Sequence, residues 1–230
     1  MAKKKGKLIV IDGTDGSGKS TQIKYLLDRL AKDKVKTKYI HFPEYDNFIG
    51  GFIKHCLNEQ YYNFVEVHPK IVSVLYAADR FESSAQIIKW LEDGYIVVLD
   101  RYVSANQIHQ GGKIKDIKKR KEFLEWLDEL EYKVFKIPRA DITLYLSLPI
   151  EVSTNLLHER SKKAALEYGG GKQDVHEVDL EFQKNSIKSA LWLSKTIPNF
   201  VKINCMGKKA IRTREDIHEE VYEKVKKVLK

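Results

Sequence analysis

The stretch IVIDGTDGSGKSTQ, residues 9–22, places a short apolar run directly before three glycines, a lysine and several hydroxyl side chains. Gly13, four intervening residues and Gly18-Lys19-Ser20 form the pattern G-x-x-x-x-G-K-[ST]. A loop of this kind wraps phosphate oxygens in backbone N–H groups, and its lysine and hydroxyl reach the outer phosphates and Mg²⁺. The pattern requires a strand before it and a helix after it, and we expect a strand ending at Ile11 and a helix beginning near Lys19. The stretch therefore predicts a phosphate-binding loop, or P-loop.

The composition of the chain limits the number of domains, the kinds of partner and the cellular compartment that can be expected. Its 230 residues are 43% hydrophobic, enough to bury one sizeable core, and we expect a single domain over 1–230 with a basic tail at 1–6. The net charge of +9 suits nucleic acid, an anionic membrane or a small polyanionic substrate. Cys56 and Cys205 form no CxxC pair, so a reducing compartment is expected. The apolar run at 8–11 is too short for a signal peptide or a membrane span, which predicts a cytoplasmic protein without a membrane partner.

Runs of β-branched and aromatic residues alternate with helical spacing along the chain. The predicted strands are 8–11, 38–42, 95–99, 142–148 and 200–204. The predicted helices include one marked by Ile23, Leu26, Leu27 and Leu30, a long one that runs from 71 to 91, and a final one at 214–229 that begins with the cap-like TRED. Four strands lack a polar face, as strands covered on both sides do. We expect an α/β protein, a three-layer P-loop fold with a five-stranded parallel sheet flanked by helices and a mobile lid.

The lid is expected where the segment EYGGGKQD, residues 167–174, interrupts a helical region. Each of its three consecutive glycines costs a helix about 1 kcal/mol relative to alanine. A flexible segment of this kind can close over a reaction and exclude water from it.

A carboxylate follows the third predicted strand, in the segment YIVVLDRY. A P-loop shares its Mg²⁺ with a carboxylate at the end of a neighbouring strand. Ligands of open α/β sheets collect outside the carboxyl ends of the strands, where Gly13, Asp100 and FPEYD (42–46) all lie. We therefore predict Ser20 and Asp100 as magnesium ligands. The alternative for Asp100 is a surface pair with Arg101.

Five segments fall in the order and spacing of thymidylate kinases, and the chain resembles that family over essentially its whole length. The segments are DGTDGSGKST, FPEYD with Ile49-Gly50, YAADRFE (76–82), DRYVSANQIHQGG (100–112) and DVHEVDLEF (174–182). The resemblance implies transfer of the γ-phosphoryl group of ATP to dTMP, giving dTDP, with Mg²⁺ as cofactor. A nucleoside monophosphate, whose second pKa is about 6, is ionised near neutral pH and attacks without a general base.

The resemblance also implies roles for the residues around the P-loop. ATP would contact Gly13, Thr14, Asp15, Gly16, Ser17, Gly18, Lys19, Ser20 and Thr21. Lys19 would hold the β and γ phosphates, Arg101 the acceptor phosphate, and Asp15 the 3′-hydroxyl of the acceptor sugar. The alternative for Asp15 is a carboxylate that stabilises the turn.

For the acceptor base and sugar, the resemblance implies that Tyr76 stacks on thymine, Arg80 reaches a base oxygen and Tyr102 packs against the sugar. The further implied contacts of dTMP are Phe42, Pro43, Glu44, Tyr45, Asn106, Gln107 and Gln110, and which amide bonds the base stays open. Relatives often have an arginine at 44–45, and because this chain has Glu44-Tyr45, Arg101 would carry more of the acceptor phosphate.

Position 16 is an arginine in some thymidylate kinases, whereas other members bring cations from a lid. This chain has Gly16, so the resemblance places the missing charge in the lid at about 158–175. Arg160 is the first candidate, followed by Lys162, Lys163 and Lys172. Relatives are homodimers, and the apolar face within 71–91 would serve as the interface.

Other functions stay open from the sequence alone. A deoxynucleoside kinase would need a general base, for which Glu44 is the candidate, and another nucleoside monophosphate kinase is a second alternative. A non-catalytic, nucleic-acid-binding P-loop protein is a remote one. The lysines of this chain lack the interleaved aromatic residues that stack on bases in proteins that bind single strands. We therefore expect nucleotides rather than nucleic acid as partners.

Overall fold

A five-stranded parallel sheet forms the centre of the structure, a computed structural model that describes residues 5–58, 61, 63–156, 159 and 179–230. The strands are β1 (Lys7–Gly13), β2 (Thr37–His41), β3 (Ile96–Asp100), β4 (Ile142–Ser147) and β5 (Phe200–Asn204). They lie in the order β2-β3-β1-β4-β5, and every neighbouring pair is parallel. The predicted α/β class with a five-stranded parallel sheet is thus confirmed, and the predicted strand bounds agree within two residues.

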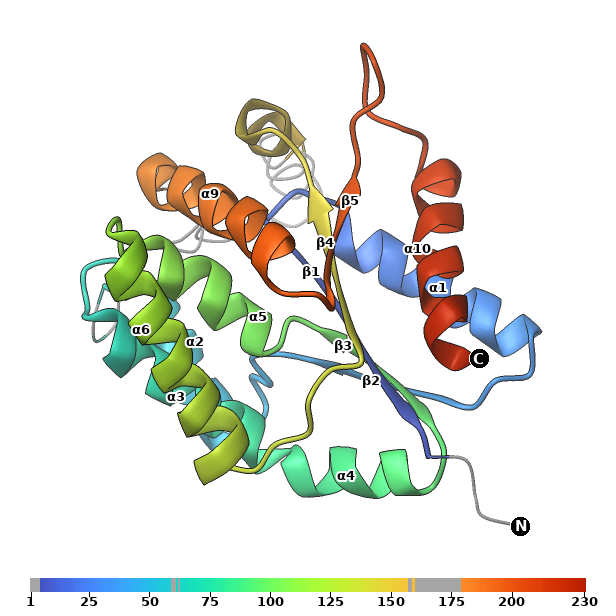
Figure 1. Cartoon of the computed structure of the whole chain (residues 1–230), viewed down its shortest axis with the longest axis horizontal. Helices are drawn as coiled ribbons and strands as arrows, with labels where there is room; N and C mark the ends of the chain where they lie inside the picture. Colours follow the sequence, from blue (N-terminus) through green and yellow to red (C-terminus); the bar gives the residue numbers. More distant parts are fainter. Residues whose placement is uncertain (1–4, 59–60, 62, 157–158, 160–178) are drawn as a thin grey trace.

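Helices cover both faces of this sheet (Figure 1). One face is covered by α1 (Lys19–Lys32) and α10 (Arg214–Leu229). The other elements are α2 (Phe48–Leu57), α3 (Pro69–Glu82), α4 (Ser84–Glu92), α5 (Val103–Ala105), α6 (Ile117–Asp128), α9 (Leu180–Thr196) and the π-helical turns η1 (Asn106–Gln110) and η2 (Glu129–Val134). No helix in the described ranges is long and apolar enough to cross a bilayer.

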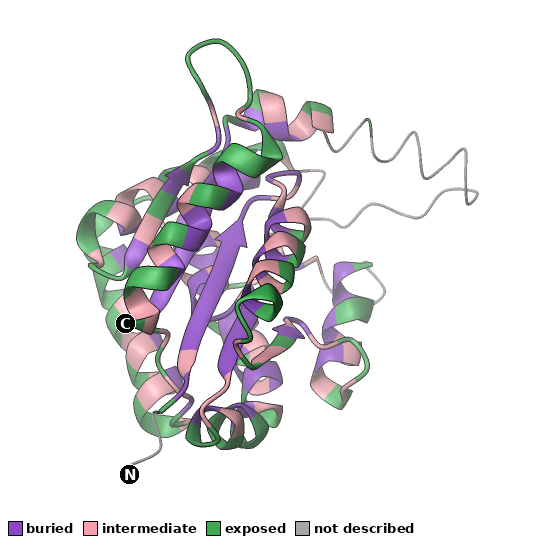
Figure 2. Ribbon diagram, turned by 90° about the vertical axis from the view of Figure 1, so that its right-hand side faces the viewer, coloured by how far each residue is buried: buried purple, intermediate pink, exposed green. Residues whose placement is uncertain are grey.

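The apolar character of the strands follows from this two-sided cover. In β1, Ile9 and Ile11 pack with residues of α1 and α10, whereas Leu8 and Val10 pack with residues of α4 and α6. Each of these four apolar side chains therefore enters one of two cores, and Figure 2 shows the central strands as buried ribbons between the helices. A polar face would have been costly on either side, which is why the strand sequence does not alternate.

The long helix predicted from 71 to 91 is wrong, because the structure breaks it into α3 and α4 at Ser83. Two serines explain the break: the Ser84 hydroxyl donates to the Phe81 carbonyl at 2.8 Å, and the Ser83 hydroxyl donates to Glu44. The final helix begins as expected, since the Thr213 hydroxyl accepts a hydrogen bond from the Asp216 N–H at 3.1 Å.

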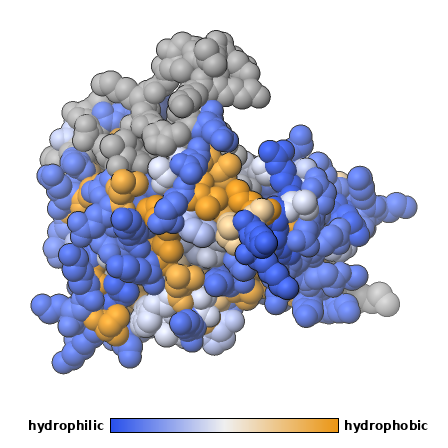
Figure 3. All heavy atoms as spheres, turned by 90° about the horizontal axis from the view of Figure 1, so that it is seen from above, coloured by the Kyte–Doolittle hydropathy of each residue, from blue (hydrophilic) through white to orange (hydrophobic). Residues whose placement is uncertain are grey.

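The register brings the predicted site residues to one edge of the sheet. Ile11 of β1 and His41 of β2 both lie beside Asp100 of β3. The segments that leave these strands therefore begin close together, at the carboxyl ends where α/β proteins bind ligands. Figure 3 views the molecule from the side of these carboxyl ends and shows hydrophobic residues lying between hydrophilic ones.

Candidate phosphoryl-transfer site

The P-loop lies between the end of β1 at Gly13 and the start of α1 at Lys19. Gly16 and Gly18 have φ values of 77° and 91°, in the left-handed region that glycine adopts without strain. Lys19 curls back over the loop, where its Nζ donates to the carbonyls of Gly13 at 2.9 Å and Thr14 at 3.2 Å. Burial lowers the pKa of this lysine. The loop and the helix start thus provide backbone N–H groups and one ammonium for anionic oxygens.

A carboxylate beneath the loop, Asp12, was missed by the sequence analysis. Its Oδ2 accepts from the Ser104 hydroxyl at 2.6 Å and its Oδ1 from the Gly13 N–H at 2.8 Å. Burial raises its pKa, although the charges of Arg101 and Lys19 oppose the shift. Asp12 fastens the P-loop to the segment after β3. The signal for it was the same as for Asp100, a carboxylate at the end of an apolar run.

Asp100 is buried, and its Oδ2 lies 3.2 Å from Nδ1 of His41. Burial alone would raise its pKa, but the bond from His41 and the charges of Lys19 and Arg101 outweigh this, and the pKa is lowered. Its Oδ1 has no hydrogen-bond partner among the described residues. An ionised carboxylate with an unpartnered buried oxygen fits a magnesium ligand, and Ser20 in the first turn of α1 has an exposed hydroxyl for the same ion.

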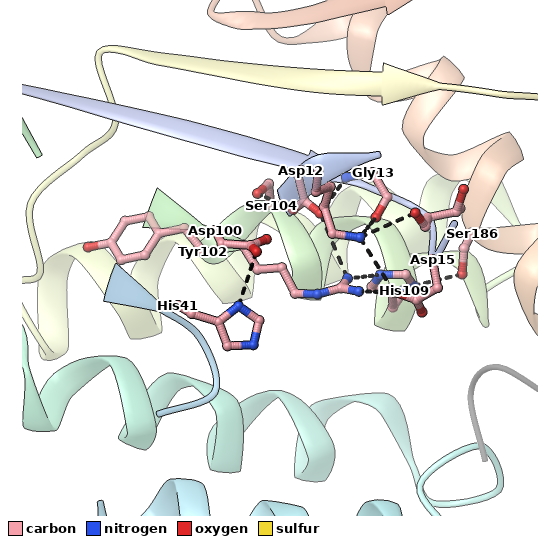
Figure 4. Close-up of polar contacts among 12 residues, drawn as sticks. Asp12, Gly13, Asp15, His41, Asp100, Tyr102, Ser104, His109 and Ser186 are labelled. Atoms are coloured by element: carbon pink, nitrogen blue, oxygen red, sulfur yellow. Dashed lines mark hydrogen bonds and ion pairs between the residues drawn. The ribbon is translucent and has the colours of Figure 1, made fainter. Parts of the chain in front are cut away.

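Arg101 follows Asp100 with a φ of 65°, a strained conformation for a residue other than glycine. Its Nη2 bonds Asp15 Oδ1, and its Nη1 lies 3.1 Å from His109 Nε2 and 3.9 Å from Asp12 Oδ1 (Figure 4). Burial would lower its pKa, but the nearby carboxylates raise it. The side chain is 17% exposed, so a half-buried cation lies beside the P-loop and keeps some access to solvent.

Beside Arg101 lies a first cavity of about 140 Å³, which we call the acceptor pocket. Seven residues that the sequence predicts for dTMP line it: Asp15, Pro43, Tyr45, Tyr76, Arg101, Asn106 and Gln110. Four further residues complete the lining: His41, Leu57, Ala105 and His109. Three of the lining residues belong to η1, a π-helical turn, and such turns recur at functional sites.

Amide groups give the acceptor pocket its hydrogen-bonding character. Both N–H groups of Asn106 are used, because Nδ2 donates to the Ser73 carbonyl at 3.1 Å and to Glu131 Oε1 at 3.3 Å. Only its Oδ1 remains, as an acceptor. Gln110 is buried, and its Oε1 has no partner among the described residues. Asn106 therefore offers the pocket an acceptor, which suits a ligand that carries an N–H group.

Five predicted dTMP contacts lie outside this lining: Phe42, Glu44, Arg80, Tyr102 and Gln107. Tyr102 is buried, and its hydroxyl donates to the Pro138 carbonyl at 3.0 Å. Arg80 is buried in an ion pair with Glu131 and also donates to the Tyr102 carbonyl at 3.3 Å. Glu44 accepts from Ser83 and, at 3.3 Å, from Asn47. The side chains of Tyr102, Arg80 and Glu44 are thus bonded to neighbours that border the pocket, and none of these neighbours was evident from the sequence.

A second cavity, of about 510 Å³, lies on the other side of the P-loop, and we call it the donor pocket. Gly16, Ser17 and Gly18 line it from the P-loop. Five apolar residues, Leu148, Leu156, Cys205, Ile211 and Ile217, line the rest of it together with polar residues such as Gln22 and Arg214. Arg212 fastens the loop after β5, because it donates to the Asn204 carbonyl and to Asp216 Oδ2, both at 2.7 Å.

The predicted lid at about 158–175, with Arg160, Lys162, Lys163 and Lys172, lies outside the described residues except for Glu159. Glu159 lines the donor pocket.

Asp79 of α3 holds the segment after β2 against the helix. It is fully buried, its Oδ1 accepts from the Glu44 N–H at 3.2 Å, and its Oδ2 has no partner among the described residues. Burial, aided by Glu44 and Glu82, raises its pKa to about 6. Because the folded-state pKa exceeds the ordinary value of 3.8, the ionised form is penalised in the folded protein above pH 6. This cost declines as the pH falls toward 4.

We therefore expect Asp79→Asn to raise the free energy of unfolding at pH 7 by about 1 kcal/mol, since the amide keeps the acceptor oxygen and removes the buried charge. The gain should shrink as the pH is lowered from 7 to 5. Urea unfolding at pH 7, 6 and 5 measures both effects. Asp28→Asn, at an exposed position of α1, is the control with no expected change. An Asp79→Asn protein less stable than wild type at pH 7 would contradict the account.

A family model, relatives in sequence and a solved structure all relate this chain to thymidylate kinases. The family model of thymidylate kinase matches residues 11–204. The thymidylate kinase of Plasmodium falciparum is 29% identical over 98% of this chain and 92% of that protein, and the one of Halothermothrix orenii is 31% identical over 96% and 97%. The solved structure of thymidylate kinase from Candida albicans has the same fold, with a TM-score of 0.72 at 24% identity over 98% of this chain and 94% of that chain. The chain therefore belongs to the thymidylate kinase family and is a phosphotransferase.

Proposed function

We propose that this family member, which transfers a phosphoryl group to dTMP, takes that group from the γ position of ATP with Mg²⁺ and releases dTDP and ADP. One observation carries this proposal. The two pockets are lined by adjacent residues of a single loop, and two cations, Lys19 and Arg101, both contact Asp15 between them. Two phosphate groups bound in the two pockets would face each other across these charges.

On the donor side, the P-loop N–H groups would bind the phosphates of ATP, and the apolar residues of the donor pocket would contact adenine. Lys19 would turn from its own loop carbonyls to the β and γ phosphates. Ser20 and Asp100 would hold Mg²⁺, which when bound neutralises charge on the phosphate oxygens. The unpartnered oxygen of Asp100 supports this assignment.

On the acceptor side, Arg101 would bind the phosphate of dTMP and Asp15 the 3′-hydroxyl of its sugar. Tyr76 would stack on the base. Asn106 would accept from the ring N–H of thymine, since its own N–H groups are committed to Ser73 and Glu131. Cytosine has an acceptor at that ring position and would be rejected. Arg80, Glu44 and Tyr102 would support the pocket through the neighbours described above.

The chemistry needs charge rather than a base. The acceptor phosphate is already ionised, so its oxygen can attack the γ-phosphorus directly, and the barrier comes from repulsion between two anions. Arg101 and Lys19 offset that repulsion. The structure places Glu44, the base of the deoxynucleoside-kinase alternative, with Ser83 and Asn47 rather than in the pocket lining, which favours a monophosphate acceptor.

Residues 1–230 would act as one kinase domain, with the lid at about 158–175 supplying Arg160 to the transferred group. A reducing compartment such as the cytoplasm suits the chain, whose cysteines Cys56 and Cys205 are both unpaired.

A homodimer would form through α3 and α4. Ile71, Val74, Phe81 and Ile88 are exposed on these helices, with Ile71 at 59% and Phe81 at 51% of full exposure. Large apolar side chains of this kind, gathered within 71–91, are typical of a surface that a second protein covers. The mass of the protein in solution, measured by light scattering, tests this assignment.

The acceptor assignment is tested by ADP release from ATP and Mg²⁺ with dTMP, dUMP, dCMP, UMP, AMP, dGMP and thymidine offered separately. We expect dTMP to have the highest kcat/KM and dCMP to be slower by at least about 100-fold, because a hydrogen bond to the base cannot form. Turnover of thymidine but not dTMP would overturn the proposal in favour of a nucleoside kinase. Equal rates with dTMP and dCMP would overturn the role of Asn106.

A further inference from the structure

His109 of η1 lies in the acceptor pocket between Arg101 and α9 (Figure 4). Its Nε2 is 3.1 Å from Nη1 of Arg101, and its Nδ1 is 3.0 Å from the hydroxyl of Ser186 on α9. Its ring stacks on Phe182, also on α9, with the two planes 14° apart. The imidazole is thus held at both nitrogens and on one face.

The hydrogen bonds that link Arg101, His109 and Ser186 can be donated in only one direction. A guanidinium only donates, so His109 Nε2 must accept from Arg101 and the ring proton must be on Nδ1. Nδ1 then donates to the Ser186 oxygen, and the single proton of that hydroxyl goes to the Phe182 carbonyl at 2.9 Å. The chain of hydrogen bonds runs from Arg101 through His109 and Ser186 to the backbone of α9, and His109 takes part in it as a neutral ring.

A neutral acceptor on Arg101 has a different effect from a carboxylate. Asp15 bonds Nη2, and Asp12 lies 3.9 Å from Nη1, so carboxylates draw the guanidinium toward the P-loop. His109 contacts Nη1 without adding negative charge. A second full carboxylate contact would instead neutralise the cation that has to bind the acceptor phosphate.

We propose that His109 is a positioning residue, which holds the Arg101 guanidinium toward the acceptor phosphate and anchors it through Ser186 to α9. The inference rests on the proposed role of Arg101 in binding the phosphate of dTMP. It assigns to His109 an effect that depends on the phosphate of the ligand, because the residue acts through Arg101 and not through the base. It also makes α9 part of the acceptor site.

The test compares dTMP with thymidine, which carries the same base and sugar without the phosphate. In His109→Phe the ring can still stack on Phe182 but has no acceptor for Arg101. We expect its Kd for dTMP, measured by calorimetry, to rise by about 10-fold, the usual effect of losing one hydrogen bond to a charged group. Its Kd for thymidine and its KM for ATP should stay within about twofold of the wild-type values, since neither depends on the Arg101 contact.

Two further variants separate positioning from structure. His109→Gln places an amide oxygen near the position of Nε2 and should restore most of the lost affinity for dTMP. Ser186→Ala removes the anchor and should raise the Kd for dTMP by about threefold, whereas Ser189→Ala on the same helix, whose hydroxyl donates to the Gln107 carbonyl, should not change it.

Each result decides the inference. Equal weakening of dTMP and thymidine in His109→Phe would show a structural role and overturn it, and so would a His109→Gln protein as weak as His109→Phe. If wild-type protein fails to phosphorylate dTMP, the proposed function is at fault instead. The preference of wild type for dTMP over thymidine in binding still reports on Arg101 and His109 in that case.

Discussion

Replacing Lys19 by methionine is expected to lower kcat for dTMP phosphorylation by about 10³-fold, because a cation that acts on transferring phosphates contributes at least that much. Lys19 is buried in the P-loop, and its Nζ contacts only loop oxygens, those of Gly13, Thr14 and Asp15, among the described residues. Methionine fills a similar volume, so the loop should keep its shape while the charge is lost. Steady-state ADP release at saturating ATP and dTMP measures the effect.

Lys24→Met is the matched control, because Lys24 is exposed on the same helix. Its kcat should stay within about twofold of wild type, as surface substitutions usually do. The far-ultraviolet circular dichroism of the Lys19→Met protein should match that of wild type. A folded Lys19→Met protein that kept a tenth of the wild-type kcat would contradict the assignment of this lysine to the transferred phosphate.

The sheet could be predicted from the sequence because its signals are local. Runs such as LIVI and IVVL are apolar on both faces, and the P-loop pattern fixes the strand and the helix that flank it. The break at Ser83 could not be predicted, because apolar spacing continues across it. Its cause includes a hydrogen bond from Ser83 to Glu44, 39 residues earlier in the chain, which no local pattern shows.

The same distinction between local sequence signals and long-range contacts applies to the site. Motif residues such as Asp15, Arg101 and Asn106 come together because each follows a strand that ends at the same edge of the sheet. The residues that orient them come from elsewhere: Glu131 of η2 bonds both Arg80 and Asn106, and Ser186 of α9 bonds His109. Such pairings depend on tertiary packing. The residues that would contact the substrates are therefore easier to predict from the sequence than the residues that orient them.

The second large effect is expected at Arg101. Arg101→Lys should lower kcat/KM for dTMP by about 10²-fold, because an ammonium keeps the charge but not the planar fork. The guanidinium contacts Asp15 through Nη2 and His109 through Nη1 at once, and the shorter lysine head cannot span both. The KM for ATP should change by less than about threefold, since the donor is bound on the other side of the loop.

Lysine is the informative substitution because a neutral side chain would remove one of the two cations beside Asp15, and the one nearest Asp12, and would destabilise the loop. Both arginine and lysine bear the same backbone strain at a φ of 65°, so the comparison isolates the side-chain head. Arg139→Lys is the control. Arg139 is an exposed arginine that donates to Asp128 through Nη1 and Nη2, both at 2.7 Å, and it has no proposed role in binding phosphate. Its kinetics should match those of wild type. If Arg101→Lys kept most of the wild-type kcat/KM for dTMP, a point charge would suffice at this position, and the case for a positioned guanidinium held by Asp15 and His109 would fail.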